Sequence, residues 1–85
     1  MTQKATTKDE LFLIKLHELA LSHGDFDKEV DRFSVGRAIG QNDRGVNAIV
    51  VLLAKANFVK IGEANNVYLT ALGLDLVQTL LIERR

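Results

Sequence analysis

The chain has 85 residues and a formal net charge of zero, which fits one small domain and gives no overall attraction to polyanions. Hydrophobic residues make up 47% and charged residues 26% of the sequence, a balance typical of globular proteins and unlike that of disordered or collagen-like chains. The absence of cysteine excludes disulfide frameworks, thiolate nucleophiles and cysteine-ligated metal sites. We expect one domain over residues 1–85, with residues 1–6 frayed ahead of the first helix.

The first expected helix begins at a capping box, Thr7-Lys8-Asp9-Glu10. In this motif the threonine side chain caps the first turn and the glutamate reaches back to the backbone of the cap. The helix continues over 11–21, and Gly24 is placed to end it. Helical spacing puts four residues on its inward stripe: Phe12, Leu16, Leu19 and Ala20. A second apolar stripe on the opposite side holds Leu11, Ile14 and Leu21.

Residues 25–32 alternate acidic with other residues and predict a connection that contains a short edge strand. A short helix is expected over 33–40, followed by turn and cap residues at 41–43. A longer helix is then expected over about 43–57. Its predicted core face consists of Val46, Ile49, Leu52 and Leu53.

Two β-rich pieces, 58–61 and 67–69, predict a β-hairpin, because glycine and asparagine in the loop 62–66 tolerate positive φ. Thr70 can cap a last helix over about 71–82. Its predicted inward residues are Leu72, Leu76 and Leu80, and its second apolar stripe is Leu74, Val77 and Leu81. The expected fold class is mainly α with a small β-hairpin wing (α+β), in the order helix, helix, helix, hairpin, helix.

The segment 35–49 has the spacing of a helix-turn-helix. Gly36 stands where two helices would cross closely, Gly40 stands at the turn, and apolar residues lock the pair: Val35, Ile39, Val46 and Ile49. This segment resembles the helix-turn-helix family. Phe58-Val59-Lys60 and Leu69-Thr70-Ala71-Leu72-Gly73 look like the wing strand and the exit into the last helix of MarR-like and ArsR-like winged-helix repressors. The resemblance covers residues 7–82 and implies a winged helix-turn-helix.

The resemblance implies a small transcriptional regulator that binds duplex DNA, with a recognition helix over about 43–57 in the major groove and a wing over 58–69 beside it. The base contacts would come from Arg44, Asn47 and Val51, with Arg44 pairing with guanine and Asn47 with adenine. The phosphate contacts would come from Arg32, Arg37, Lys55 and Lys60. Asn42 and Asp43 are expected to cap the helix or contact DNA. Five cations and one anion in residues 32–60 favour an anionic partner.

The two outer stripes predict a homodimer through the first and last helices, because together they would expose an apolar patch of interface size. The expected interface residues are Leu11, Ile14, Leu21, Leu74, Val77 and Leu81. A winged-helix module that binds a protein and not DNA is the alternative. It is favoured by the zero net charge and by Glu63 at the wing tip.

No motif predicts catalysis, a cofactor or a metal site. His17 and His23 are six residues apart and would not share a helix face, and no glycine-rich phosphate loop is present. We therefore expect no enzyme activity and no bound metal. No apolar run approaches the roughly 20 residues that a bilayer span needs, and the first residues lack a secretory core, so we expect a cytoplasmic protein with no membrane contact.

Overall fold

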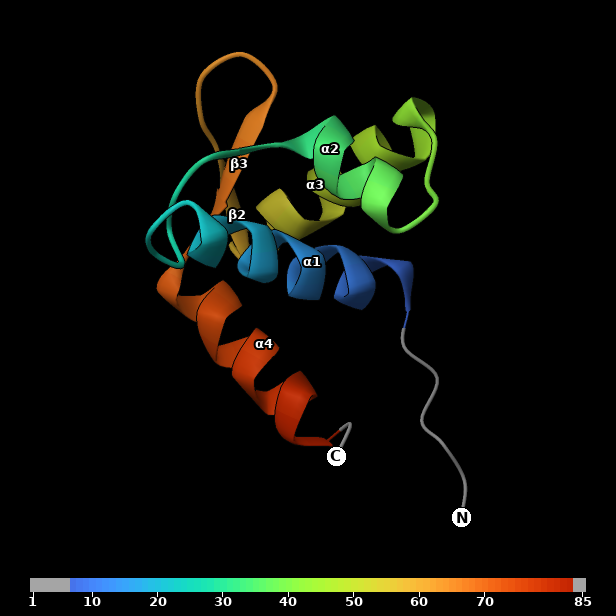
Figure 1. Ribbon diagram of the computed structural model, residues 1–85. Helices are drawn as coiled ribbons and strands as arrows, with labels where there is room; N and C mark the ends of the chain where they lie inside the picture. The colour runs from blue at the N-terminus through green and yellow to red at the C-terminus, as the bar shows by residue number, and fades with distance from the viewer. Residues whose placement is uncertain (1–6, 84–85) are drawn as a thin grey trace.

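The computed structural model describes residues 7–83, and within that range the chain is mainly helical with a small antiparallel sheet (Figure 1). This agrees with the α+β class expected from the sequence. Residues 1–6, expected to be frayed, lie outside the described residues. The elements follow one another as α1 (Lys8–Ser22), β1 (Val30–Asp31), α2 (Arg32–Ala38), α3 (Asp43–Lys55), β2 (Val59–Ile61), β3 (Asn66–Leu69) and α4 (Ala71–Glu83).

The sheet has β3 at its centre, paired antiparallel with β1 on one side and β2 on the other. Val67 of β3 lies opposite Val30 of β1, and Leu69 lies opposite Val59 of β2. All four side chains are buried. The edge strand expected within residues 25–32 is therefore confirmed as β1, which widens the predicted hairpin into a three-stranded sheet.

Side-chain caps fix where the helices begin. Thr7 Oγ1 accepts from the Glu10 backbone N–H at 3.2 Å, and Glu10 Oε1 accepts from the Thr7 N–H at 3.1 Å, which confirms the capping box. Thr70 Oγ1 accepts from the Gly73 N–H at 3.0 Å and so caps α4 as predicted. Asp31 Oδ1 accepts from the Phe33 N–H, so α2 begins at Arg32, one residue earlier than expected.

The turns agree only in part with the predictions from the sequence. Gly40 adopts φ +78° between α2 and α3, as the turn prediction requires. Asn57, at φ +66°, ends α3 two residues sooner than predicted. In the loop between β2 and β3 the positive φ belongs to Ala64 and not to the glycine or asparagines expected there. Gly62 is needed for space, because a Cβ on it would lie 2.4 Å from the Glu29 carboxyl carbon.

The core lies around α1, which packs against α2, α3, α4 and β3. Figure 1 shows α1 between the α2 and α3 pair and α4. Helix α2 crosses α3 closely at Gly36, where a Cβ would stand 2.1 Å from Val46 Cγ2, so the predicted need for a small residue is confirmed. The fully buried large side chains are Phe12, Leu13, Leu16, Leu69, Val35, Val46, Val50, Val59, Val67 and Val77.

The inward faces of α3 and α4 differ from the predicted ones. In α3, Val50 is buried and Leu52 is 57% exposed, because the core is met by positions 46, 49, 50 and 53 and position 52 falls to the side. In α4, Leu72 is 51% exposed, since Gly73 touches the backbone before β2 and turns the positions 73, 77 and 80 inward. No helix within residues 7–83 combines the length and apolar character that crossing a membrane requires.

Candidate nucleic-acid interface

Helix α3 presents a continuous exposed stripe on the side away from the core. Arg44, Asn47, Val51 and Lys55 follow one another at spacings of three and four residues, which places them on one helix face. All four are exposed, whereas positions 46, 49, 50 and 53 on the other face are buried. The structure therefore brings the three predicted base-contact residues and one predicted phosphate contact together.

Two further cations of the middle segment lie on elements that pack against α3. Arg37 on α2 and Lys60 on β2 are exposed, and Arg37 Nη2 donates to Ser34 Oγ at 3.3 Å. In Figure 1, α2, α3 and the β2–β3 hairpin lie on the side of α1 opposite α4. No carboxylate within residues 7–83 forms an ion pair with Arg44, Lys55 or Lys60. Their charges are therefore not neutralised by the described part of the chain.

Arg32 joins the hairpin loop to α3. Its Nε donates to the carbonyl oxygen of Asn65 at 3.1 Å, and its Nη1 donates to Asn47 Oδ1 at 3.1 Å. Arg32 and Asn47 were predicted separately as a phosphate and a base contact, and their hydrogen bond was not predicted. Nothing in the sequence signals these contacts, because Asn47 and Asn65 are 15 and 33 positions from Arg32 and meet it only through tertiary packing.

Glu29 holds the same loop from the other side. Its Oε1 accepts from the Glu63 backbone N–H and from Asn66 Nδ2, each at 3.2 Å. The carboxylate lies against Gly62, where a side chain would collide with it. Glu29 was expected only as part of a solvated connection. Instead it fixes the β2–β3 loop relative to β1. Two residues next to β1, Glu29 and Arg32, therefore position this loop.

The start of α3 uses its polar residues for capping. Asn42 Oδ1 accepts from the Gly45 N–H at 2.8 Å, which is the capping role expected of it. Asp43 is the first residue of α3, and its side chain is exposed. A carboxylate at this position interacts favourably with the positive end of the helix dipole. The side-chain oxygen of Asn42 is thereby engaged in capping α3. Arg44 is the first residue of the exposed stripe.

The apolar residues expected at a dimer interface differ in accessibility. Leu11, Leu21 and Leu81 are exposed, Leu21 to 50%, and Ile14 and Leu74 are half-buried. Val77 is fully buried in the core, so its predicted place on an exposed stripe is wrong. The reason is the phase of α4, whose inward face is set by Gly73. Five of the six residues are therefore at least partly exposed.

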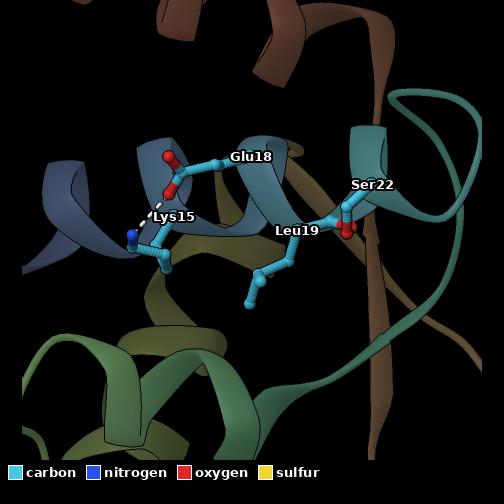
Figure 2. A network of polar contacts seen from close by, with 4 residues as sticks. All are labelled: Lys15, Glu18, Leu19 and Ser22. Carbon is cyan, nitrogen blue, oxygen red and sulfur yellow. Dashed lines mark hydrogen bonds and ion pairs between the residues drawn. The ribbon is translucent and has the colours of Figure 1, made fainter.

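Helix α1 carries an ion pair of its own, shown in Figure 2. Lys15 Nζ donates to Glu18 Oε1, and Ser22 Oγ donates to the Leu19 carbonyl oxygen at 2.6 Å one turn further on. The hydrogen bond from Lys15, together with its positive charge, lowers the pKa of Glu18 below its ordinary value. Lys15 is thus a cation that is already paired, unlike Lys55.

We expect the Lys15→Ala substitution to raise the pKa of Glu18 toward its ordinary value, because the donor and the charge are both removed. A lowered carboxyl pKa stabilises the folded state above the unfolded-state pKa, and this contribution is lost as pH falls through the folded-state pKa. The effect on stability should be small because the pair is on the surface. Carbon-13 NMR titration of the Glu18 carboxyl measures the shift, and an unchanged pKa in the variant contradicts the pairing.

Comparisons with known proteins give no further assignment. No protein-family model, curated protein or solved structure matches the chain. Within residues 7–83 no group of three histidine, cysteine, aspartate or glutamate side chains is arranged to hold a metal ion.

Proposed function

We propose that the chain is a winged helix-turn-helix protein that binds duplex DNA as a small cytoplasmic transcriptional regulator. The observation that carries the proposal is the exposed stripe Arg44, Asn47, Val51 and Lys55 on α3, opposite the core face of the same helix. Helix α3 is the second helix of a pair that crosses at Gly36, and the β2–β3 hairpin follows it. This order is that of helix-turn-helix proteins with a wing, in which the second helix enters the major groove.

The side chains of the stripe suit the edges of base pairs. Arg44 can donate two parallel hydrogen bonds to the O6 and N7 atoms of guanine, and Val51 can contact a thymine methyl group. Lys55 at the far end of α3, Arg37 on α2 and Lys60 on β2 can contact phosphates on the two sides of the groove. Arg32 keeps guanidinium donors beyond its two contacts and can add a fourth phosphate contact.

Salt dependence tests the proposal most simply, because phosphate contacts release counterions. We expect the affinity of one chain, with four phosphate contacts, for a duplex of about 20 base pairs to fall roughly 100-fold between 50 and 200 mM salt, and that of a dimer with eight contacts roughly 10,000-fold. Lys55→Ala should weaken binding and reduce the salt slope by about one. Lys15→Ala changes the net charge equally but removes a cation on α1 that is paired with Glu18, so it is the matched control. Fluorescence anisotropy measures both, and equal effects of the two substitutions contradict the assigned face.

Binding to a protein is the second candidate, and one observation favours it. Val51 and Leu52 on α3 and Ile61 on β2 are each more than half exposed, which is unusual for a surface that contacts only phosphates and bases. Their aliphatic side chains would suit the apolar centre of a protein interface. A folded chain that binds no duplex at 50 mM salt favours this candidate over DNA.

We propose further that the chain forms a two-fold dimer through α1 and α4. Leu11, Leu21 and Leu81 are exposed and Ile14 and Leu74 half-buried, so α1 and α4 offer apolar area that a second copy can cover. Two copies would also double the number of cations that face one duplex, which compensates for the zero net charge of each chain.

The paired substitutions Leu21→Glu and Leu81→Glu should raise the dimer dissociation constant at least tenfold, because each places a charge in an apolar interface. Both side chains are exposed in one chain, so folding should be retained. Leu72→Glu is the control, since position 72 lies on the opposite side of α4 from position 81. Sedimentation velocity measures the oligomeric state. A wild-type protein that stays monomeric at high micromolar concentration contradicts the dimer.

A further inference from the structure

Arg32 lies between the wing loop and α3 and hydrogen-bonds to both. Its backbone N–H and its Nε donate to the carbonyl oxygen of Asn65, at 3.0 and 3.1 Å. Its Nη1 donates to Oδ1 of Asn47, on the exposed face of α3. Arg32 itself is half-buried. One side chain therefore ties the loop of the hairpin to a residue in the middle of the exposed stripe.

This contact dictates how the Asn47 amide is turned. A guanidinium group has five N–H donors and no acceptor, so only the oxygen of the amide can face it. The Nδ2 group of Asn47 is then left for an outside partner, and no residue within 7–83 accepts a hydrogen bond from it. Asn47 thus presents two free donors, while one of the two lone pairs of its oxygen accepts from Arg32 and turns the oxygen toward the guanidinium.

An amide in this orientation can distinguish the two purines. In the major groove guanine offers two acceptors, N7 and O6, whereas adenine offers the acceptor N7 beside the N6 amino donor. The familiar asparagine–adenine pair uses the amide oxygen as acceptor and the amide nitrogen as donor. An amide turned with its oxygen toward Arg32 directs its Nδ2 donors away from Arg32. These donors match the two acceptors of guanine, whereas at adenine they meet the N7 acceptor and the N6 amino donor.

We propose that Arg32 is a positioning residue that sets the base preference of α3: by holding the Asn47 oxygen, it makes Asn47 select guanine over adenine. The inference rests on the proposed DNA binding and deepens it. It also replaces the expectation from the sequence that Asn47 pairs with adenine. Arg32 acts on the base through Asn47 and through the placement of the wing loop.

Arg32→Lys tests this role, because it keeps the positive charge but removes the planar fork that reaches two acceptors at once. We expect the wild-type protein to prefer guanine over adenine about tenfold at the base pair that Asn47 reaches, and Arg32→Lys to reverse the preference to adenine. Selection from random duplexes identifies the site, and competition between duplexes that differ at that one base pair measures the ratio. Lys15→Arg is the control and should keep the wild-type preference, because Lys15 lies on α1, is paired with Glu18 and belongs to no proposed DNA contact.

Two further measurements keep the test decisive if Arg32→Lys folds poorly. Asn47→Ala, at an exposed position, should abolish the guanine preference of the wild-type site, and circular dichroism checks that this variant is folded. In the free protein, the NMR signals of the Asn47 side-chain amide should move in Arg32→Lys and stay in place in Lys15→Arg. A wild-type preference for adenine, or the same preference in wild type and Arg32→Lys, overturns the inference alone. A wild-type protein that binds no duplex overturns the proposed function and this inference with it.

Discussion

Replacing Arg44 and Asn47 together by alanine should abolish sequence preference at two base pairs and weaken specific binding by about 1–3 kcal/mol for each lost contact. Both side chains are exposed on α3, and neither belongs to the core. The loss should therefore appear in specific binding, while binding to unrelated duplexes falls much less, since Lys55 and Lys60 remain. Competition between a selected site and a random duplex measures the ratio.

The double variant must be shown to fold as the wild type does, because Asn47 also accepts a hydrogen bond from Arg32. Far-ultraviolet circular dichroism and thermal unfolding serve that purpose. Ala48→Ser is a control on the same exposed face, with a small side chain that adds no long donor. Specific binding that is unchanged in the double variant would contradict the assignment of base contacts to α3.

Gly73→Ala is expected to destabilise the fold by about 3 kcal/mol, the largest effect on stability of the single changes considered. A Cβ at position 73 would lie 2.1 Å from the carbonyl oxygen of Phe58, a backbone atom that cannot rotate away. That oxygen also accepts from the Thr70 N–H, and the Phe58 N–H donates to the Leu53 carbonyl oxygen, so moving the strand entry would disturb both bonds. The free energy of unfolding of a small domain is only about 5–15 kcal/mol, so Gly73→Ala should remove a large fraction of it.

Thermal unfolding should show a decrease in Tm of about 15 °C for Gly73→Ala. Gly40→Ala is the matched control, since Gly40 has φ +78° and nothing within 4 Å of a Cβ. It should cost about 1–2 kcal/mol through backbone conformation alone. A Gly73→Ala protein with wild-type Tm would contradict the close packing of α4 on the residue before β2.

The local signals in the sequence predicted the element order and much of the local chemistry. The capping box at Thr7, the caps at Asn42 and Thr70 and the turn at Gly40 all depend on neighbouring residues, which the sequence shows directly. The close approach at Gly36 was predictable for the same reason. The exposed stripe on α3 was also predictable from the sequence, because helical spacing separates the polar residues of this helix from its apolar ones.

The details that depend on tertiary packing were not predictable. Helix α4 is apolar around much of its circumference, so periodicity alone could not decide whether Leu72 or Val77 faces inward. The contact of Gly73 with Phe58 decides it. Likewise, the hydrogen bonds of Glu29 and Arg32 to the wing loop join residues more than 30 positions apart. No pattern of neighbouring residues carries that information.

The most direct test of DNA binding through α3 is an amide chemical-shift titration of the protein with a mixed-sequence duplex of about 20 base pairs at low salt, repeated at roughly 200 mM salt. The proposed function predicts shifts that cluster on α2, α3 and β2, over residues 32–60, and that fade at the higher salt. A folded protein that shows no shifts at low salt, or shifts that centre on α1 and α4, would contradict DNA binding through this face.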